Sequence, residues 1–570
     1  MKVYNKSVDL IITAPNSDIA VQGKSLPEDI TGKLSSAGIG INTEVQVQAK
    51  AIPGKGGALK SGNTLVKTTV DDTEINPWDV AHLAADALGK NATYVEPDLY
   101  NQFIADKKII SPAGELTAKS FGMGKPRSED DFDTDWLPGQ NTVWHLEKEY
   151  SQLKPAREAV SAIDYKIRIG QIDTGYSSTH FIIPDSVKNN PLQRNFVDEE
   201  TYNDAHDPYS KGLLKNPGHG TGVYGILAGD KITIDTATGK FEDYLGGAYF
   251  AEVISCRISK SVVLLKTNAF AEALNYLTQL SLSGKQVHVV SMSMGGAPSK
   301  VWADAVNAAY KAGITVVTAS GNNFGGLPTR HVIYPARFKR VIAACGVTYE
   351  KKPYWHKKAT EMQGCYGPPK HMTKALSAFT PNTPWASVES GNISFSGAGT
   401  SSATPQIAAA AAIYYKKNHA ELDALEPWQR VEAIRYALFK SAEKEVGDPQ
   451  YDNDFTNYFG NGILKAHDAL NIPVNKNLPM TPEDSVPWFP ILNTLFKSVP
   501  DEAKKAKRDM FNTEIAQLVY YYPELFAIID NGDGDYVPKE DAKWETFKNA
   551  VINHPDASVT LTKYLQEAEL

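Results

Sequence analysis

Short apolar runs rich in β-branched residues alternate with longer amphipathic segments in the middle of the chain. The runs that have the pattern of buried strands are 167–172, 287–292, 314–318 and 341–345. The segments 268–280 and 301–312 have the spacing of helices. Because strands that alternate with helices form mostly parallel sheets covered on both faces, residues 140–471 are predicted to be one α/β unit.

The pattern before this unit is different. Residues 1–103 contain short strand-like runs, at 8–14, 45–52, 64–70 and 92–99. The segment 77–88 has the pattern of a helix, which Asn76 can cap and Gly89 can end. The pattern predicts a small α+β domain.

Two stretches read as linkers. Residues 104–139 combine Gly and Pro with a dense acidic run, which favours a solvated linker; a processing site near 125–127 is the alternative. Residues 472–490 are rich in proline, which argues against regular structure. The remaining segment, 491–570, has a helical pattern and is predicted to be a helical C-terminal domain.

Composition narrows the function classes. Of the 570 residues, 42% are hydrophobic and 22% charged, and the net charge is −8, which gives no indication of nucleic-acid binding. No segment approaches the roughly 18 consecutive apolar residues of a membrane span, so no membrane partner is expected. The apolar run near the N-terminus is short and contains Asp9, so it does not have the pattern of a secretory signal and a cytoplasmic location is expected. Cys256 and Cys345 lie in apolar runs, typical of reduced core residues.

Three short motifs carry candidate chemistry. Asp173 ends a predicted strand, His219 lies between two glycines, and Ser401 precedes a Thr-Pro helix start followed by a run of alanines. A serine at the start of a buried helix lies in a positive potential that favours an oxyanion. Taken singly, each has a structural alternative: a turn aspartate, a packed histidine and a helix cap. Ser402 competes with Ser401 for the role of nucleophile.

In the order Asp-Thr-Gly, His-Gly-Thr and Gly-Thr-Ser-Ser-Ala-Thr-Pro, these motifs resemble the active-site blocks of the subtilisin-like serine proteases. The resemblance implies a subtilisin-like, mostly parallel sheet sandwiched by helices, and a serine endopeptidase that works through an acyl-enzyme. It implies Asp173, His219 and Ser401 as the triad, since the family's nucleophile directly follows Gly-Thr. It also implies Asn322 as the oxyanion donor.

The same resemblance implies a binding edge and a restraint. Extended protein or peptide substrate would pair with Ser293, Met294, Gly295 and Gly296, although Met294 could equally be a core residue. Many relatives carry His, Met and His where this chain has Gly222, Ser402 and Gln406, which concerns substrate preference rather than reaction class. Residues 1–103 are similar to a subtilase propeptide, which implies a zymogen with an intramolecular inhibitor. An ordinary accessory domain is the alternative.

Other interpretations remain open at this stage. A single Asp-Thr-Gly triplet does not supply the two carboxylates of a pepsin-like protease. A latent subtilase that acts mainly in binding is the non-enzymatic alternative. No cofactor is required for the chemistry, but a helix–acidic loop–helix pattern near the C-terminus is similar to an irregular calcium site, and a solvated acidic turn is the alternative. Its candidate ligands are Asp530, Asp533, Asp535 and Glu540.

Overall fold

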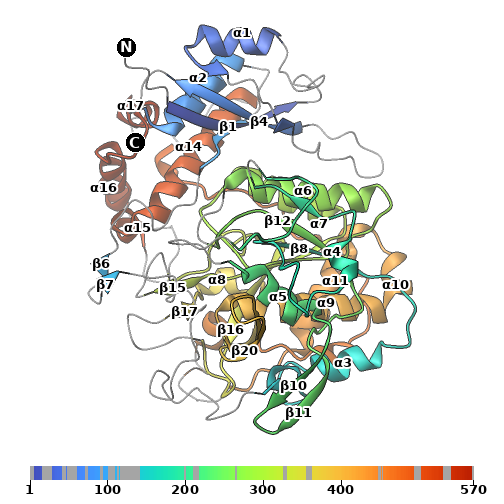
Figure 1. The fold of residues 1–570 in the computed structure, drawn as a ribbon. Helices are drawn as coiled ribbons and strands as arrows, with labels where there is room; N and C mark the ends of the chain where they lie inside the picture. Colours follow the sequence, from blue (N-terminus) through green and yellow to red (C-terminus); the bar gives the residue numbers. More distant parts are fainter. Residues whose placement is uncertain are drawn as a thin grey trace.

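A sheet of seven parallel strands forms the centre of the largest part of the molecule (Figure 1). In the computed structural model its order is β18 (Ala375–Phe379), β16 (Val341–Val347), β14 (Thr315–Ala319), β13 (Val289–Met292), β8 (Arg168–Asp173), β12 (Glu252–Arg257) and β9 (Arg194–Asn195). The four strands predicted from apolar runs are β8, β13, β14 and β16. The predicted parallel α/β fold is therefore confirmed.

The structure describes residues 6–15, 28–41, 46–47, 61–70, 75–89, 94–99, 110–111, 114–115, 142–197, 200–209, 217–262, 266–324, 330–354, 362–446, 451, 454–492, 502–530 and 541–567. Within them, no helix combines the length and apolar character that a membrane span requires. Cys256 and Cys345 are buried and form no disulfide, as predicted.

Helices cover both faces of the sheet because alternate strand residues are apolar on each side. One face packs against α6 (Thr267–Leu282) and α7 (Lys300–Lys311), which are the two predicted helices. The other face packs against α9 (Thr400–Lys417), whose alanine run is buried. Small side chains let α9 lie close to the strands, and α5 (His219–Ala228) contacts α9. The first turns of α5 and α9 carry the candidate histidine and serine.

The N-terminal unit is an antiparallel sheet with two helices. Its strand order is β2 (Gly40–Ile41), β4 (Ser61–Val70), β1 (Lys6–Pro15) and β5 (Tyr94–Pro97), with β3 (Gln46–Val47) paired to β4. Helix α2 spans Pro77–Leu88, and Asn76 accepts a hydrogen bond from Trp78 N at 2.9 Å, as predicted. Helix α1 (Glu28–Ser36) was not predicted, because its apolar positions are few.

The C-terminal unit contains α14 (Glu502–Tyr521), α15 (Pro523–Ile529), α16 (Asp541–Ile552) and α17 (Val559–Glu567) around its own apolar core. The segment before it has no helix or strand between residues 472 and 489. This segment lies on the central unit, where buried Asp484 accepts hydrogen bonds from the backbone of Lys339 at 2.6 Å and Arg340 at 3.0 Å. Figure 1 shows the blue N-terminal and red C-terminal units side by side.

Smaller elements complete the described structure. They are β6 (Ile110–Ser111), β7 (Gly114–Glu115), η4 (Trp144–Leu146), α3 (Leu153–Ala159), α4 (Asp185–Lys188), β10 (Lys231–Thr236), β11 (Gly239–Tyr244), β15 (Asn322–Phe324), β17 (Met362–Gly364), α8 (Pro369–Met372), β19 (Thr383–Ser387), β20 (Asn392–Gly397), α10 (His419–Asp423), α11 (Pro427–Ser441), α12 (Phe455–Phe459), α13 (Ala466–Ala469) and η6 (Pro490–Leu492). The rest of the predicted linker 104–139, apart from β6 and β7, lies outside the described residues.

Candidate active site

A buried carboxylate and an imidazole are joined at the carboxyl edge of the sheet. Asp173, the last residue of β8, accepts a hydrogen bond through Oδ1 from His219 Nδ1 at 2.7 Å. Asp173 is 1% exposed and His219 is 5% exposed. A hydrogen bond to a carboxylate that is shielded from water is stronger than the same bond on a surface, so this contact fixes the orientation of the imidazole.

Backbone packing explains how these two motifs meet. Gly220 lies so close to the Asp-Thr-Gly turn that a Cβ added to it would be 2.0 Å from Gly175 O. Thr174 Oγ1 accepts a hydrogen bond from Gly220 N at 3.0 Å, and Gln171 Nε2 donates to Gly220 O at 2.7 Å. Thr174, Gly175 and Gly220 therefore hold the first turn of α5 against the end of β8.

Ser401 lies in the first turn of α9, an 18-residue helix. Its backbone is therefore in the positive potential of a helix N-terminus. Ser402 is fully buried, and its hydroxyl donates to Thr380 Oγ1 at 2.9 Å and Gly399 O at 3.0 Å. The geometry thus gives Ser402 a structural role inside the helix start.

The predicted substrate edge continues β13 beside Ser401. Ser401 Oγ donates to Ser293 O at 3.3 Å, and Ser293 Oγ donates to Ser401 O at 3.0 Å. On the opposite side, Gly296 N donates to Tyr334 O at 2.8 Å. Gly295 packs closely on the same neighbour as Gly296, since a Cβ added to Gly295 would be 2.7 Å from Tyr334 O. Met294 is buried in the apolar core next to α6 and α7.

Asn322 lies beside the start of α9. Its Oδ1 accepts hydrogen bonds from Thr400 N at 2.9 Å and Thr400 Oγ1 at 3.2 Å. These two bonds orient the carboxamide and leave its Nδ2 as the group that can donate to a ligand near Ser401. The structure therefore brings together Asp173 with His219, and Asn322 with the residue before Ser401.

Sequence reasoning did not identify the support around these residues. Arg257, at the end of β12 next to Asp173, is buried, donates to Thr174 O and pairs with Glu200 at 2.9 Å. Gln406 Nε2 donates to Phe379 O at 2.7 Å and so ties α9 to β18. Arg257 ends an apolar run, which is the only sequence signal that could have indicated it.

The candidate calcium ligands have little structural support. Asp533, Asp535 and Glu540 lie outside the described residues, while Asp530 follows α15 and donates its backbone N–H to Phe526 O at 2.9 Å. Among the residues that the structure describes, no three or more His, Cys, Asp or Glu side chains are grouped to hold a metal ion. The calcium site stays a prediction.

Asp173 and His219 thus form a hydrogen-bonded pair at the carboxyl edge of a parallel sheet, and Ser401 lies at the start of a buried helix that packs on the same sheet. The sequence profile of the subtilase family matches residues 164–462, which is more than half of the chain. The chain belongs to the subtilase family, and it is a serine endopeptidase with a subtilisin-like fold.

Individual relatives agree with this assignment. Subtilisin DY of Bacillus licheniformis is 27% identical over 319 residues, which cover 55% of this chain and 94% of that protein. Subtilisin Savinase of Lederbergia lenta is 29% identical over 253 residues, or 44% of this chain and 77% of that protein. Fervidolysin from Fervidobacterium pennivorans has a similar fold, with a TM-score of 0.51 and 16% identity over 83% of this chain and 62% of fervidolysin.

Proposed function

We propose that this protein hydrolyses peptide bonds through a triad of Asp173, His219 and Ser401. Ser401 Oγ attacks the scissile carbonyl, and His219 takes the proton of the hydroxyl and later gives it to the leaving amine. Asp173 holds the imidazole in position and stabilises its charged form. The observation that carries this proposal is the 2.7 Å bond between Asp173 Oδ1 and His219 Nδ1, because it leaves Nε2 for the serine.

Attack by Ser401 places negative charge on the carbonyl oxygen of the substrate. Two donors are available for it: the backbone N–H of Ser401 in the first turn of α9 and the Nδ2 of Asn322. Because both are fixed before substrate arrives, they stabilise the tetrahedral intermediate without reorganisation. Water then hydrolyses the acyl-enzyme with His219 again acting as the base.

Substrate binding is proposed at the edge formed by residues 293–295. Ser293 O lies next to Ser401, and an extended peptide can pair with this edge as an added strand. Rotation of Ser401 Oγ from Ser293 O toward His219 Nε2 would accompany this pairing. Backbone pairing gives affinity without strict sequence requirements, so side-chain pockets set the preference.

The triad is tested by hydrolysis of an unfolded protein substrate. His219→Ala should lose activity while the thermal unfolding temperature stays near that of the wild type. His419→Ala is a matched control, since His419 is partly exposed and begins α10, just past the end of α9 opposite to Ser401. Equal activity of His219→Ala and wild type would refute the proposed mechanism.

We also propose that the N-terminal unit restrains the enzyme. Two acidic residues of this unit reach the starts of the helices on the sheet face. Asp98 Oδ1 accepts a hydrogen bond from Asn268 N at 2.8 Å in the first turn of α6, and Glu96 Oε2 accepts one from Val301 N at 3.5 Å in α7. Both carboxylates therefore act as helix caps supplied by another unit.

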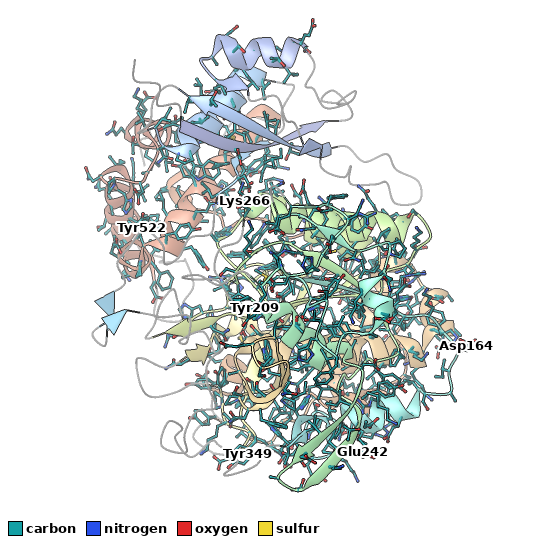
Figure 2. The ribbon with its side chains drawn as sticks, in the orientation of Figure 1. Asp164, Tyr209, Glu242, Lys266, Tyr349 and Tyr522 are labelled. Atoms are coloured by element: carbon teal, nitrogen blue, oxygen red, sulfur yellow. The ribbon has the colours of Figure 1, made fainter. Side chains whose placement is uncertain are left out.

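A lysine of the central unit reinforces this contact. Lys266 lies between the two units (Figure 2), and its Nζ is 3.0 Å from Asp9 Oδ2 and 3.8 Å from Asp98 Oδ2. The chain then leaves the sheet at Leu99, whose carbonyl accepts a hydrogen bond from Thr267 N at 3.2 Å. The described part of the N-terminal unit thus ends bound to the first residue of α6.

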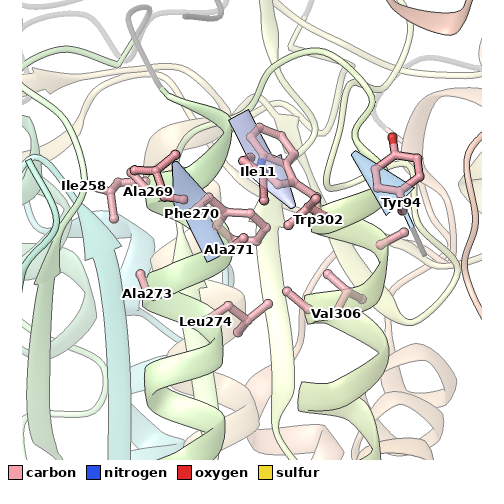
Figure 3. Packing of buried hydrophobic residues seen from close by; sticks show 14 of the residues in the cluster. Ile11, Tyr94, Ile258, Ala269, Phe270, Ala271, Ala273, Leu274, Trp302 and Val306 are labelled. Atoms are coloured by element: carbon pink, nitrogen blue, oxygen red, sulfur yellow. The ribbon is translucent and has the colours of Figure 1, made fainter. Parts of the chain in front are cut away.

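Apolar packing surrounds these polar contacts. Ile11 and Tyr94 of the N-terminal sheet lie next to Phe270 of α6 and Trp302 of α7 (Figure 3), and all four belong to one buried cluster. Burial of large aromatic and aliphatic side chains is the main source of affinity at such contacts. The arrangement supports a docked inhibitor rather than an independent accessory domain.

The restraint is tested by weakening the docking. Asp98→Ala removes the cap of α6, so the initial rate of peptide hydrolysis should rise above that of the wild type. Asp29→Ala is the matched control, because Asp29 is exposed on α1. Size-exclusion chromatography after cleavage of the linker shows whether Asp98→Ala releases the N-terminal unit. The proposed restraint is refuted if the unit is released and the rate of peptide hydrolysis does not rise.

A further inference from the structure

The N-terminal unit is bound on a second side by the C-terminal helices. Helix α14 contacts α2 and β5, and α17 contacts α2. Met510 of α14 belongs to the same buried cluster as the N-terminal sheet, and the Phe511 ring lies 4.7 Å from the His82 ring. The N-terminal unit is therefore enclosed between the central unit and the C-terminal unit.

Buried polar contacts make this second interface specific. His82 Nε2 of α2 lies 3.0 Å from Glu514 Oε2 of α14, and both side chains are 1% exposed. Glu514 also accepts hydrogen bonds from Ser558 N at 2.8 Å and Ser558 Oγ at 3.1 Å. The bonds to Ser558 lie within the C-terminal unit and hold the Glu514 carboxylate in place. Because buried polar groups are costly to leave without partners, separation of the two units is disfavoured by the loss of the His82–Glu514 contact.

Three further contacts tie the three units together. Trp78 Nε1 of α2 donates to Gln517 Oε1 of α14 at 2.9 Å. The same glutamine donates through Nε2 to Pro298 O at 3.0 Å, two residues beyond Gly296. Tyr94 OH donates to Thr513 Oγ1 at 2.9 Å. Gln517 thus bridges the N-terminal unit and the segment that follows the proposed substrate edge.

An aspartate of the N-terminal unit also caps a C-terminal helix. Asp79 accepts hydrogen bonds from Val559 N and Thr560 N, both at 2.9 Å, and from Thr560 Oγ1 at 2.7 Å. Its carboxylate therefore stabilises the first turn of α17 from another unit.

The C-terminal unit is anchored independently of the N-terminal unit. Thr481 O accepts from Arg340 Nη2 at 2.8 Å, and Asp484 N donates to Asn307 Oδ1 at 2.9 Å. These contacts hold the segment 472–489 on the central unit up to the start of the C-terminal unit.

We propose that α14 and α17 form a retention surface for the N-terminal unit. This surface keeps the N-terminal unit bound after the chain between that unit and the central unit is cut. This inference rests on the proposed restraint. Cleavage within residues 104–139 would then leave the inhibitor in place, and activation would require a second event that separates α2 from α14 and α17. The linker cut and the release of the inhibitor become two distinct steps.

The test uses the full chain with a Ser401→Ala substitution, so that it cannot cut itself, and with an engineered cleavage site for another protease within residues 104–139. After cleavage, release of the N-terminal fragment is followed by size-exclusion chromatography and native mass spectrometry. The fragment should stay bound in the parent chain. Asp79→Ala and Glu514→Gln should each speed the release of the fragment. For Glu514→Gln, which weakens the buried pair with His82, the release rate should rise by roughly 30-fold or more.

Glu524→Gln is the matched control, since Glu524 is exposed on α15. Thermal unfolding of the uncut chains shows whether Glu514→Gln folds. Asp79→Ala tests the same surface from the N-terminal side, and Asp79 is only partly buried. Release rates in Asp79→Ala equal to those of the parent and of Glu524→Gln would overturn the retention surface.

The same experiment on cut chains that keep Ser401 distinguishes the proposed restraint from the proposed retention surface. In these chains both the retention of the fragment and the peptidase activity are measured. A retained fragment with low peptidase activity supports both the restraint and the retention surface. A retained fragment with full activity would overturn the restraint and leave the retention surface intact. Rapid loss of the fragment from the parent chain would overturn the retention surface whatever the activity.

Discussion

The indole of Trp385 occupies the space that a side chain at position 222 would need. A Cβ added to Gly222 would lie 1.9 Å from Trp385 Cε2. The same indole packs against the imidazole of His219, with ring centroids 5.5 Å apart and planes at 60°. Glycine at this position is therefore matched to a tryptophan that packs on His219, the proposed base.

Gly222→Ala should displace Trp385 and disturb His219. We expect the free energy of unfolding to fall by about 1–3 kcal/mol from overpacking. We also expect kcat to fall by up to about a hundredfold if the imidazole moves by about 1 Å. Gly225→Ala on the same helix is the control, because its added Cβ would meet Ala386 Cβ at 3.3 Å. Matching kinetics for the two variants would show that Trp385 does not position His219.

The two adjacent serines should respond differently to substitution. Ser401→Ala is expected to lower kcat by about a millionfold because it removes the nucleophile. Ser402→Ala removes two internal hydrogen bonds and should instead lower the free energy of unfolding by about 1 kcal/mol, with kcat largely kept. Steady-state kinetics and chemical denaturation measure both effects. A loss of kcat in Ser402→Ala as large as that in Ser401→Ala would exclude this assignment.

Asn322 should contribute to kcat rather than to KM. Asn322→Ala is expected to lower kcat by about 100- to 1,000-fold with KM little changed, since the donor acts on the developing oxyanion. It also removes the acceptor of the Thr400 hydrogen bonds. Asn322→Asp keeps that acceptor and loses the donor, so it should show a loss at least as large. A normal kcat in Asn322→Asp would mean that the side chain only caps α9.

Docking of the N-terminal unit should depend on pH through Glu96. Burial, only partly offset by hydrogen bonds and by Lys300, raises the pKa of this carboxyl from 4.5 to about 7. Between these values the folded state binds more protons than the unfolded state, so stability decreases as pH rises from about 4.5 to 7 and is flat above. The change is of the order of 3 kcal/mol.

Thermal unfolding across this pH range checks the effect. Glu96→Gln should remove the decrease, because the amide does not titrate, while other titrating groups act equally in both chains. Asp29→Asn on α1 is a control that should keep the wild-type pH profile. The cause is not Glu96 if the wild type and Glu96→Gln lose stability in parallel.

Local signals in the sequence were sufficient for four of the seven strands of the central sheet and for single helices. Asn76 and Gly89 predicted the ends of α2, and the apolar runs predicted β8, β13, β14 and β16. The resemblance to the subtilisin-like proteases also implied that Asp173 and His219 would meet, and the two are hydrogen-bonded.

Contacts between distant segments could not be read in this way. Trp385 follows a proline in a polar region, and nothing in its local pattern indicates packing against His219. The His82–Glu514 pair joins residues 432 positions apart, and each residue alone has the pattern of an ordinary helix position. The predicted linker 472–490 lacks regular structure, but its composition did not show that Asp484 is buried on the central unit.

Intact-mass spectrometry of the wild-type chain and of Ser401→Ala, each with and without a fluorophosphonate probe, tests the central claim most directly. The account predicts one covalent adduct on the wild type, located at Ser401 by peptide mapping, and none on Ser401→Ala. A mass loss that corresponds to cleavage within residues 104–139, seen only in the wild type, would support self-processing. An adduct of equal yield on Ser401→Ala, or one mapped to Ser402, would contradict the assignment of the nucleophile.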